Sequence, residues 1–203
     1  MTCWRAGYPV LIYLLFFDLL AGIGIGPGMT RIGISGGLCI ILLGPVYRRE
    51  QRECLKVNYI ATGMLAIAFW FAGNLLIAWS GGGSRQIAQI SAAEREGPLW
   101  IQVAVIALIA PLAEEVVFRG LLFGRLRETL RFWPAAILSA LLFAGFHGNI
   151  VQGIYAFGGG LLMAWSYDRY HSLKAPYCIH LISNLLSLLF SSLTMRAAGG
   201  LLL

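Results

Sequence analysis

Long apolar runs separated by short polar segments recur along the whole chain. Hydropathy predicts helices at about residues 9–26, 30–47, 59–79, 99–118, 134–149, 150–167 and 176–195. Most of these runs approach the ~20 residues that a helix needs to cross ~30 Å of hydrocarbon. The pattern therefore predicts an all-α fold, a polytopic transmembrane helix bundle with about seven transmembrane helices.

Composition also points to the bilayer as the solvent of this chain. Of its 203 residues, 59% are hydrophobic and 12% are charged, and the mean hydropathy is +0.77. Soluble domains carry about 25% charged residues. No polar stretch is long enough to fold separately, so we expect residues 1–203 to form a single membrane domain. Asp18 interrupts the first apolar run, and no convincing cleavage site follows it, so we expect a retained helix.

Basic residues are distributed unevenly between the two predicted sides of the membrane. Ten lie on the side of the N-terminus, namely Arg5, Arg48, Arg49, Arg52, Lys56, Arg125, Arg127, Arg131, Arg169 and Lys174. Four lie on the other side, namely Arg31, Arg85, Arg95 and Arg196. Because cytoplasmic loops are enriched in Lys and Arg, the N-terminus is predicted to be cytoplasmic. Membrane orientation thus accounts for the net charge of +6, and no nucleic acid is expected as a partner.

Ionisable residues interrupt the fourth apolar run. Glu114 and Glu115 are adjacent, and Arg119 follows one turn later. Charged groups at membrane depth are costly unless they are paired or hydrated, so they are functional candidates. Glu115 and Arg119 are spaced i, i+4, which predicts an ion pair. Glu114 lies about 100° further round the helix and is left to act as a general base.

The predicted helices at 134–149 and 176–195 each contain one histidine. If the chain turns near residues 130–131, Glu114 and His147 are almost equally distant from the turn, so they can share a water molecule. His180 and Asn184 are spaced i, i+4 and lie on one helix face. Both side chains can donate hydrogen bonds, as an oxyanion hole requires.

Each of these features also has a structural interpretation. The pair of Glu115 and Arg119 can be a structural ion pair at the cytoplasmic boundary. His147 can be a histidine at a helix end that bonds a carbonyl, and His180 with Asn184 can hold two helices together. Independent structural reasons for all of these polar groups are harder to accept than for any one of them.

Three motifs follow one another on three predicted helices: Glu114-Glu115-x-x-x-Arg119, Phe143-x-x-x-His147 and His180-x-x-x-Asn184. Together they resemble the CPBP family, which contains CAAX prenyl endopeptidases and bacterial Abi-type proteins. The resemblance covers about half of the chain, residues 98–195, which are expected to form the catalytic core.

The resemblance implies an intramembrane endopeptidase of the glutamic type, which hydrolyses a peptide bond of a membrane-associated protein or peptide. The implied catalytic residues are Glu114, His147, His180 and Asn184, with supporting roles for Glu115, Arg119 and Phe143. The first glutamate would activate water, assisted by His147, while His180 and Asn184 would stabilise the oxyanion. No metal or other cofactor is implied, and the expected location is a bacterial or archaeal plasma membrane.

Three other functions remain open from the sequence. A zinc-dependent intramembrane protease is one, because a glutamate and two histidines can bind zinc, although no HExxH motif occurs. A non-catalytic membrane immunity or regulatory partner protein is another, with the motifs as relics. A transporter with a proton relay is less favoured, because the polar residues gather in one half of the chain.

The predicted helices create one conflict of depth. A full fifth crossing would place His147 beyond the membrane midplane, whereas His180 follows a cytoplasmic loop by only a few residues. Helices that project into the cytoplasm, or a stretch around residues 148–153 that spans the membrane incompletely, can bring the groups level. We expect the former, together with a kink. A shared site requires Glu114 and His180 to lie within about 12 Å of each other.

Overall fold

The computed structural model describes residues 3–22, 28–51, 54–79, 97–147 and 150–200. Within these ranges the chain forms helices and no strands. The helical rods are α1 (Cys3–Gly22), α2 (Gly28–Glu50), α3 (Tyr59–Trp79), a composite rod from α5 to α7, α8 (Phe132–Gly145), α9 (Ile150–Tyr170) and α10 (Lys174–Gly200). The predicted all-α class is confirmed, and each predicted helix has a counterpart.

The composite rod, called the composite helix below, is irregular along its length. It consists of α5 (Leu99–Gln102), η1 (Val103–Ile109), α6 (Ala110–Glu114), η2 (Glu115–Phe123) and α7 (Gly124–Leu126), where η denotes π-helical turns. It extends to Leu126 rather than ending near residue 118, so it has 28 residues. Since ~20 residues suffice to cross a bilayer, its ends can project from the hydrocarbon.

Four described helices are long and apolar enough to cross a membrane. They are Gly28–Glu50, Tyr59–Leu76, Leu99–Leu126 and Lys174–Leu193. The number of crossings therefore stays a prediction. The α8 helix has 14 residues and ends at Gly145, before His147, so the predicted fifth crossing over 134–149 stays a prediction as well. Glu114 and His180 nevertheless lie close together, as the expected shared site requires.

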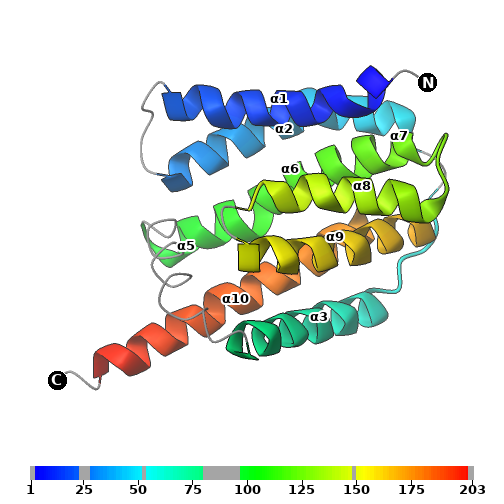
Figure 1. Cartoon of the computed structure of the whole chain (residues 1–203). Helices are drawn as coiled ribbons and strands as arrows, with labels where there is room; N and C mark the ends of the chain where they lie inside the picture. The colour runs from blue at the N-terminus through cyan, green and yellow to red at the C-terminus, as the bar shows by residue number, and fades with distance from the viewer. Residues whose placement is uncertain (1–2, 23–27, 52–53, 80–96, 148–149, 201–203) are drawn as a thin grey trace.

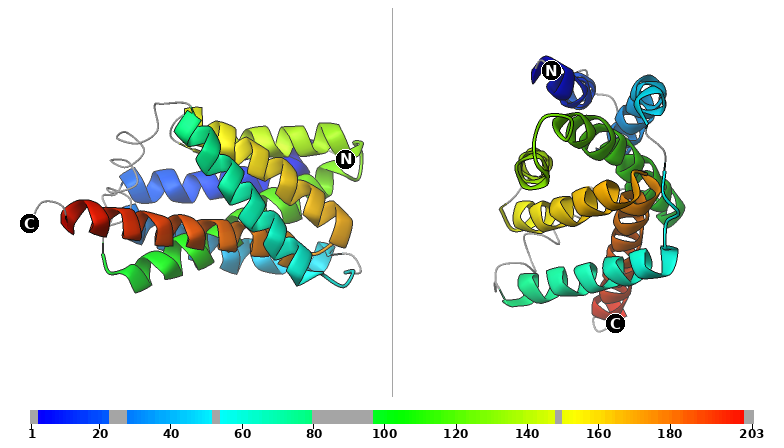
Figure 2. Two further views of the ribbon diagram at one scale, coloured as in Figure 1. Left: turned by 90° about the horizontal axis from the view of Figure 1, so that it is seen from below. Right: turned by 90° about the vertical axis from the view of Figure 1, so that its right-hand side faces the viewer.

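The rods lie side by side in one bundle, with the composite helix in the middle (Figure 1). The end-on view in Figure 2 shows α1 and α2 on one side of it and α8, α9 and α10 on the other. The α3 helix packs on α10 at the far side. The α1 helix begins at one end of the bundle and α10 finishes at the other, as an odd number of crossings requires (Figure 1). Asp18 lies in α1, but its side chain is outside the described part of the structure.

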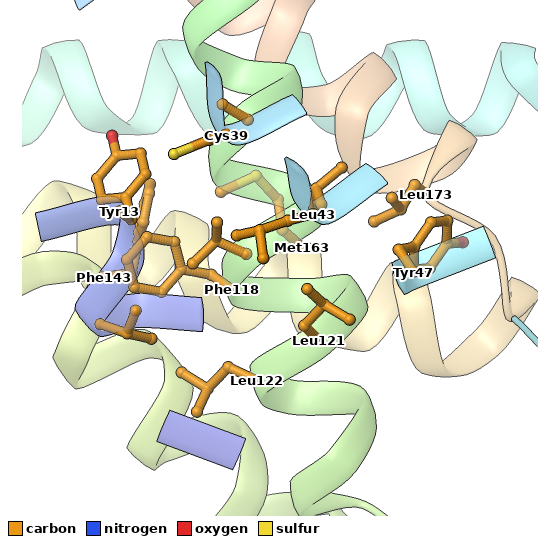
Figure 3. Close-up of a cluster of buried hydrophobic side chains, with 14 of the residues drawn as sticks. Tyr13, Cys39, Leu43, Tyr47, Phe118, Leu121, Leu122, Phe143, Met163 and Leu173 are labelled. Atoms are coloured by element: carbon orange, nitrogen blue, oxygen red, sulfur yellow. The ribbon is translucent and has the colours of Figure 1, made fainter. Parts of the chain in front are cut away.

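The composite helix supplies the centre of the apolar core. Every residue of η2, from Glu115 to Phe123, is buried. Tyr13, Phe118 and Phe143 come from three different helices and lie together in this core (Figure 3). Aromatic pairs stabilise such contacts beyond the area that they bury. This packing fixes the helix that carries both glutamates.

Side chains from α10 and α8 bond to carbonyls of the composite helix. In a π-helix each carbonyl accepts from the N–H five residues later. The fifth residue after Ile106 is Pro111, which has no N–H. Asn184 Nδ2 donates to Ile106 O at 2.9 Å instead. Ser139 Oγ likewise donates to Phe118 O at 2.9 Å. These bonds satisfy backbone acceptors that the irregular helix leaves available.

A glycine brings α9 against α8 and the composite helix. A Cβ atom on Gly160 would lie 2.8 Å from Ala140 Cβ and 3.0 Å from Ala140 Cα. The same atom would lie 3.5 Å from a guanidinium nitrogen of Arg119. Because the obstructing atoms belong to backbone or sit directly on it, they cannot move aside easily. Small residues allow this kind of close helix approach in membranes.

We predict that Gly160→Ala lowers the free energy of unfolding by about 1–3 kcal/mol, because an overpacked core must shift its backbone. Thermal unfolding of the purified protein in detergent, followed by circular dichroism, measures the effect. Gly37→Ala in α2 is the matched control, since a Cβ there meets nothing within 4 Å. Equal melting temperatures for the two variants would show that the α8–α9 contact is looser than described.

Candidate active site

A fully buried ion pair lies at the centre of the bundle. Arg119 Nε is 3.3 Å from Glu115 Oε2, and both side chains are 0% exposed. The pair that the i, i+4 spacing predicts is thus formed, although in π-helical rather than α-helical turns. The guanidinium also lies over the ring of Phe143, with Cζ 4.2 Å from the centroid. A cation placed over an aromatic face is stabilised by the ring quadrupole.

The two adjacent glutamates have different surroundings. Glu115 is completely buried, whereas the side chain of Glu114 is 18% exposed. Glu114 is the last residue of α6 and Glu115 the first of η2, so their side chains leave the helix in different directions. Only Glu114 can therefore meet water or a substrate directly.

His180 lies between the two carboxylates. Its Nδ1 is 3.0 Å from Glu115 Oε1, and its Nε2 is 3.6 Å from Glu114 Oε2. The first distance is a hydrogen bond, and the second is longer than the usual limit of about 3.2 Å. Glu114 and His180 thus lie far inside the ~12 Å that a shared site allows.

Phe143 is the aromatic contact of both histidines. Its ring centroid is 4.8 Å from that of His147 and 5.8 Å from that of His180, and both pairs are edge-to-face. His147 Nδ1 is 3.0 Å from the carbonyl oxygen of Phe143. A carbonyl only accepts, so Nδ1 carries a proton and Nε2 remains for other partners. The three motifs of the sequence therefore converge on one aromatic ring.

Asn184 has a structural bond that the sequence did not predict. One N–H of its amide donates to Ile106 O, as described above, which leaves one N–H for another acceptor. Tyr177, one turn before His180 on α10, donates from its hydroxyl to Leu108 O at 3.3 Å. These two bonds flank His180 along α10 and fix its position against the composite helix.

Tyr13 of α1 joins the site from outside the predicted catalytic core. Its hydroxyl donates a hydrogen bond to Glu114 Oε1 at 3.1 Å. No local pattern marks this contact in the sequence, because the two residues are 101 positions apart and a lone tyrosine in an apolar run is commonplace. The N-terminal half therefore contributes more than helices to the site.

The carboxylates and histidines of this cluster are of the types that bind zinc. Among the described residues, no group of three or more His, Cys, Asp or Glu side chains is arranged to hold a metal ion.

The motif-bearing part of the chain is similar to a known protein family. Residues 96–186, which contain all seven of the residues singled out above in the three motifs, match the type II CAAX prenyl endopeptidase Rce1-like family. The match covers slightly less than half of the chain, and over these residues the chain is similar to that family. The resemblance seen in the three motifs is thereby confirmed, and this similarity supports a protease that is integral to a membrane.

The chain also resembles three curated proteins, two of which are named as membrane peptidases. The chain is 27% identical over 165 residues to YdiL of Bacillus subtilis, which is named as an inferred membrane peptidase, and the match covers 74% of this chain and 67% of YdiL. It is 30% identical over 103 residues to the membrane-embedded CAAX protease MroQ of Staphylococcus aureus, covering 48% of this chain and 42% of MroQ. An uncharacterized 24.3 kDa protein of Escherichia coli is 30% identical over 95 residues, with 44% of each chain covered. The matches to the last two relatives span less than half of their lengths. No solved structure matches the chain significantly.

We predict that Arg119→Met lowers the free energy of unfolding by about 3–5 kcal/mol, because it leaves the Glu115 carboxylate buried without a cation. Denaturation by increasing fractions of sodium dodecyl sulfate measures this loss. The matched control is Arg127→Met, because Arg127 pairs with Asp168 at 2.7 Å but the two side chains are 32% and 29% exposed.

The control is expected to change stability by no more than about 1 kcal/mol, as partly exposed ion pairs contribute little. Similar small losses in both variants would mean that Glu115 finds another compensating partner when Arg119 is removed.

Proposed function

We propose that this chain is an intramembrane endopeptidase of the glutamic type, which hydrolyses a peptide bond of a membrane-associated protein or peptide. One observation carries the proposal. Glu114 is a partly exposed carboxylate beside a histidine, and that histidine is bonded to a fully buried carboxylate that pairs with arginine. The Rce1-like match and the name of MroQ support the same class of reaction.

Glu114 acts as the general base in this proposal. Tyr13 holds its Oε1 atom, while Oε2 is not within hydrogen-bond distance of His180 Nε2. A water molecule that bonds to Oε2 can give a proton to the carboxylate as its oxygen attacks the carbonyl carbon of the substrate. The protonated glutamate then returns that proton to the leaving amine. General acid–base catalysis of this type contributes ~10²–10⁴-fold to the rate.

His180 and Asn184 are proposed to polarise the carbonyl of the substrate. This role requires a proton on both ring nitrogens of His180. The Nδ1 atom then donates to Glu115, and the N–H at Nε2 can donate to the developing oxyanion. The second N–H of Asn184 is a further donor. Each donor of an oxyanion hole is worth roughly 10²–10³-fold in kcat.

His147 is proposed to assist the attacking water. Its Nδ1 proton is bonded to the Phe143 carbonyl, so Nε2 has a lone pair that can accept from water. The edge-to-face contact with Phe143 restricts the rotation of the ring. Water can thus be oriented by two acceptors, Glu114 and His147.

The site is proposed to open toward the cytoplasm. The basic residues gather at the end of the bundle where α1 begins and α7 and α9 finish, which is the predicted cytoplasmic end. We place the catalytic core within residues 98–195 of a single membrane domain that spans residues 1–203. The substrate then approaches from the bilayer, while water enters from the cytoplasmic side.

We predict that Glu114→Gln abolishes cleavage, with a loss of at least ~100-fold, because glutamine cannot take a proton from water. Purified protein in detergent is incubated with a library of quenched membrane peptides, and fluorescence release is measured. Glu128→Gln is the matched control, because Glu128 is exposed in the turn before α8.

A chelator is added in parallel reactions. Cleavage that requires Glu114 and is indifferent to the chelator supports the glutamic mechanism. Cleavage that the chelator abolishes and zinc restores would instead support the zinc-dependent protease. Equal cleavage by wild type and Glu114→Gln would remove Glu114 from the chemistry. An absence of cleavage by well-folded wild-type protein favours the immunity or regulatory function.

A further inference from the structure

The contact between α1 and Glu114 has the features of a built interaction. The side chain of Tyr13 is buried, and its ring packs edge-to-face against Phe118 and Phe146 at centroid distances of 5.8 and 5.9 Å. Figure 3 shows Tyr13 beside Phe118 and Phe143 in the core. A phenol held this way has little rotational freedom. Its hydroxyl is therefore fixed where it meets Glu114 Oε1.

A second cluster sets the position of α1 along the composite helix. Arg125 is buried and bonds both carboxylate oxygens of Glu50, with Nε–Oε2 at 2.8 Å and Nη2–Oε1 at 2.9 Å. The same guanidinium donates to the carbonyl of Arg5 and to the hydroxyl of Tyr8. Bidentate arginine–carboxylate pairs are geometrically specific. This cluster, called the Arg125 clamp, therefore ties α1 and α2 to α7.

The clamp and the tyrosine contact act on the same two helices. Tyr8 and Tyr13 are five residues apart on α1, which is about 7.5 Å along a helix axis. Arg125 and Glu114 both belong to the composite helix, which runs antiparallel to α1 in the bundle (Figure 1). Two polar attachments between a pair of helices prevent one from sliding along the other. The register of α1 thus fixes the height of the Tyr13 hydroxyl.

We propose that Tyr13 is a positioning residue of the active site, which holds Oε1 of Glu114 so that Oε2 faces the attacking water. This inference rests on the proposed function, since it assigns Glu114 the role of base. A carboxylate with one oxygen fixed cannot rotate away from water. The site is then completed by α1, an element that lies outside the matched residues 96–186.

A positioning role has a distinct kinetic consequence. Tyr13→Phe keeps the aromatic packing and removes only the hydroxyl. The substrate still binds, so KM is expected to stay unchanged, while kcat falls roughly 10- to 100-fold because the base is poorly oriented. The matched control is Tyr47→Phe, because Tyr47 is a buried tyrosine of the same core and is not part of the site. The control is expected to retain the kcat and KM of wild type.

An infrared measurement tests the contact without a substrate. The antisymmetric stretch of the Glu114 carboxylate is identified as the band that Glu114→Gln removes from the spectrum of the full-length protein in detergent. Loss of a hydrogen bond to one oxygen shifts this band. A shift is expected in Tyr13→Phe and not in Tyr47→Phe.

The outcomes separate this inference from the proposed function. If Glu114→Gln abolishes cleavage while Tyr13→Phe equals Tyr47→Phe in kcat and in the infrared band, the positioning role is wrong and the protease assignment stands. If Glu114→Gln still cleaves, the assignment of the base is wrong, and the positioning role with it, even where the infrared band shifts. A change in KM alone in Tyr13→Phe would make the tyrosine a substrate contact and overturn the inference.

Discussion

The ion pair between Glu115 and Arg119 is the constraint on which the rest of the site depends. Two opposite charges with no exposed surface can exist in this core only if their geometry and their neighbours compensate for lost hydration. The ring of Phe143 covers the guanidinium, and His180 bonds the carboxylate. Both neighbours are thereby held in place by charge. The same pair leaves the preceding residue, Glu114, as the carboxylate that reaches the surface of the cluster.

The irregular backbone of the composite helix serves this arrangement. Its π-helical turns widen the helix on both sides of α6 and leave carbonyls that other helices satisfy. Asn184 and Tyr177 bond such carbonyls on either side of His180. Docking of α10 therefore relies on backbone acceptors rather than on apolar contact alone. This matters in a bilayer, where apolar side chains gain little by leaving lipid for protein.

Much of this architecture could be predicted from sequence because it is local. Hydropathy gave the helices, and i, i+4 spacing gave the pairing of Glu115 with Arg119. The order of the motifs sufficed to expect Glu114 and His180 in one site, whereas the bond from His180 to Glu115 was not predicted. The short α8 was missed because an apolar run does not reveal where its backbone leaves the helix. Tyr13 was missed because no local pattern marks a contact across 101 residues.

The different surroundings of the two adjacent glutamates follow from the rotation of about 100° between successive residues of a helix. At the junction of α6 and η2, successive side chains diverge, so one carboxylate faces arginine and the other faces α1. Two adjacent carboxylates that pointed in the same direction at this depth would repel each other. His180 lies against both carboxylates. A change in the pair of Glu115 and Arg119 therefore affects Glu114 through the imidazole ring of His180. Structural stability and chemical reactivity are therefore coupled here, and a variant of the buried pair alters the proposed base even where the fold survives.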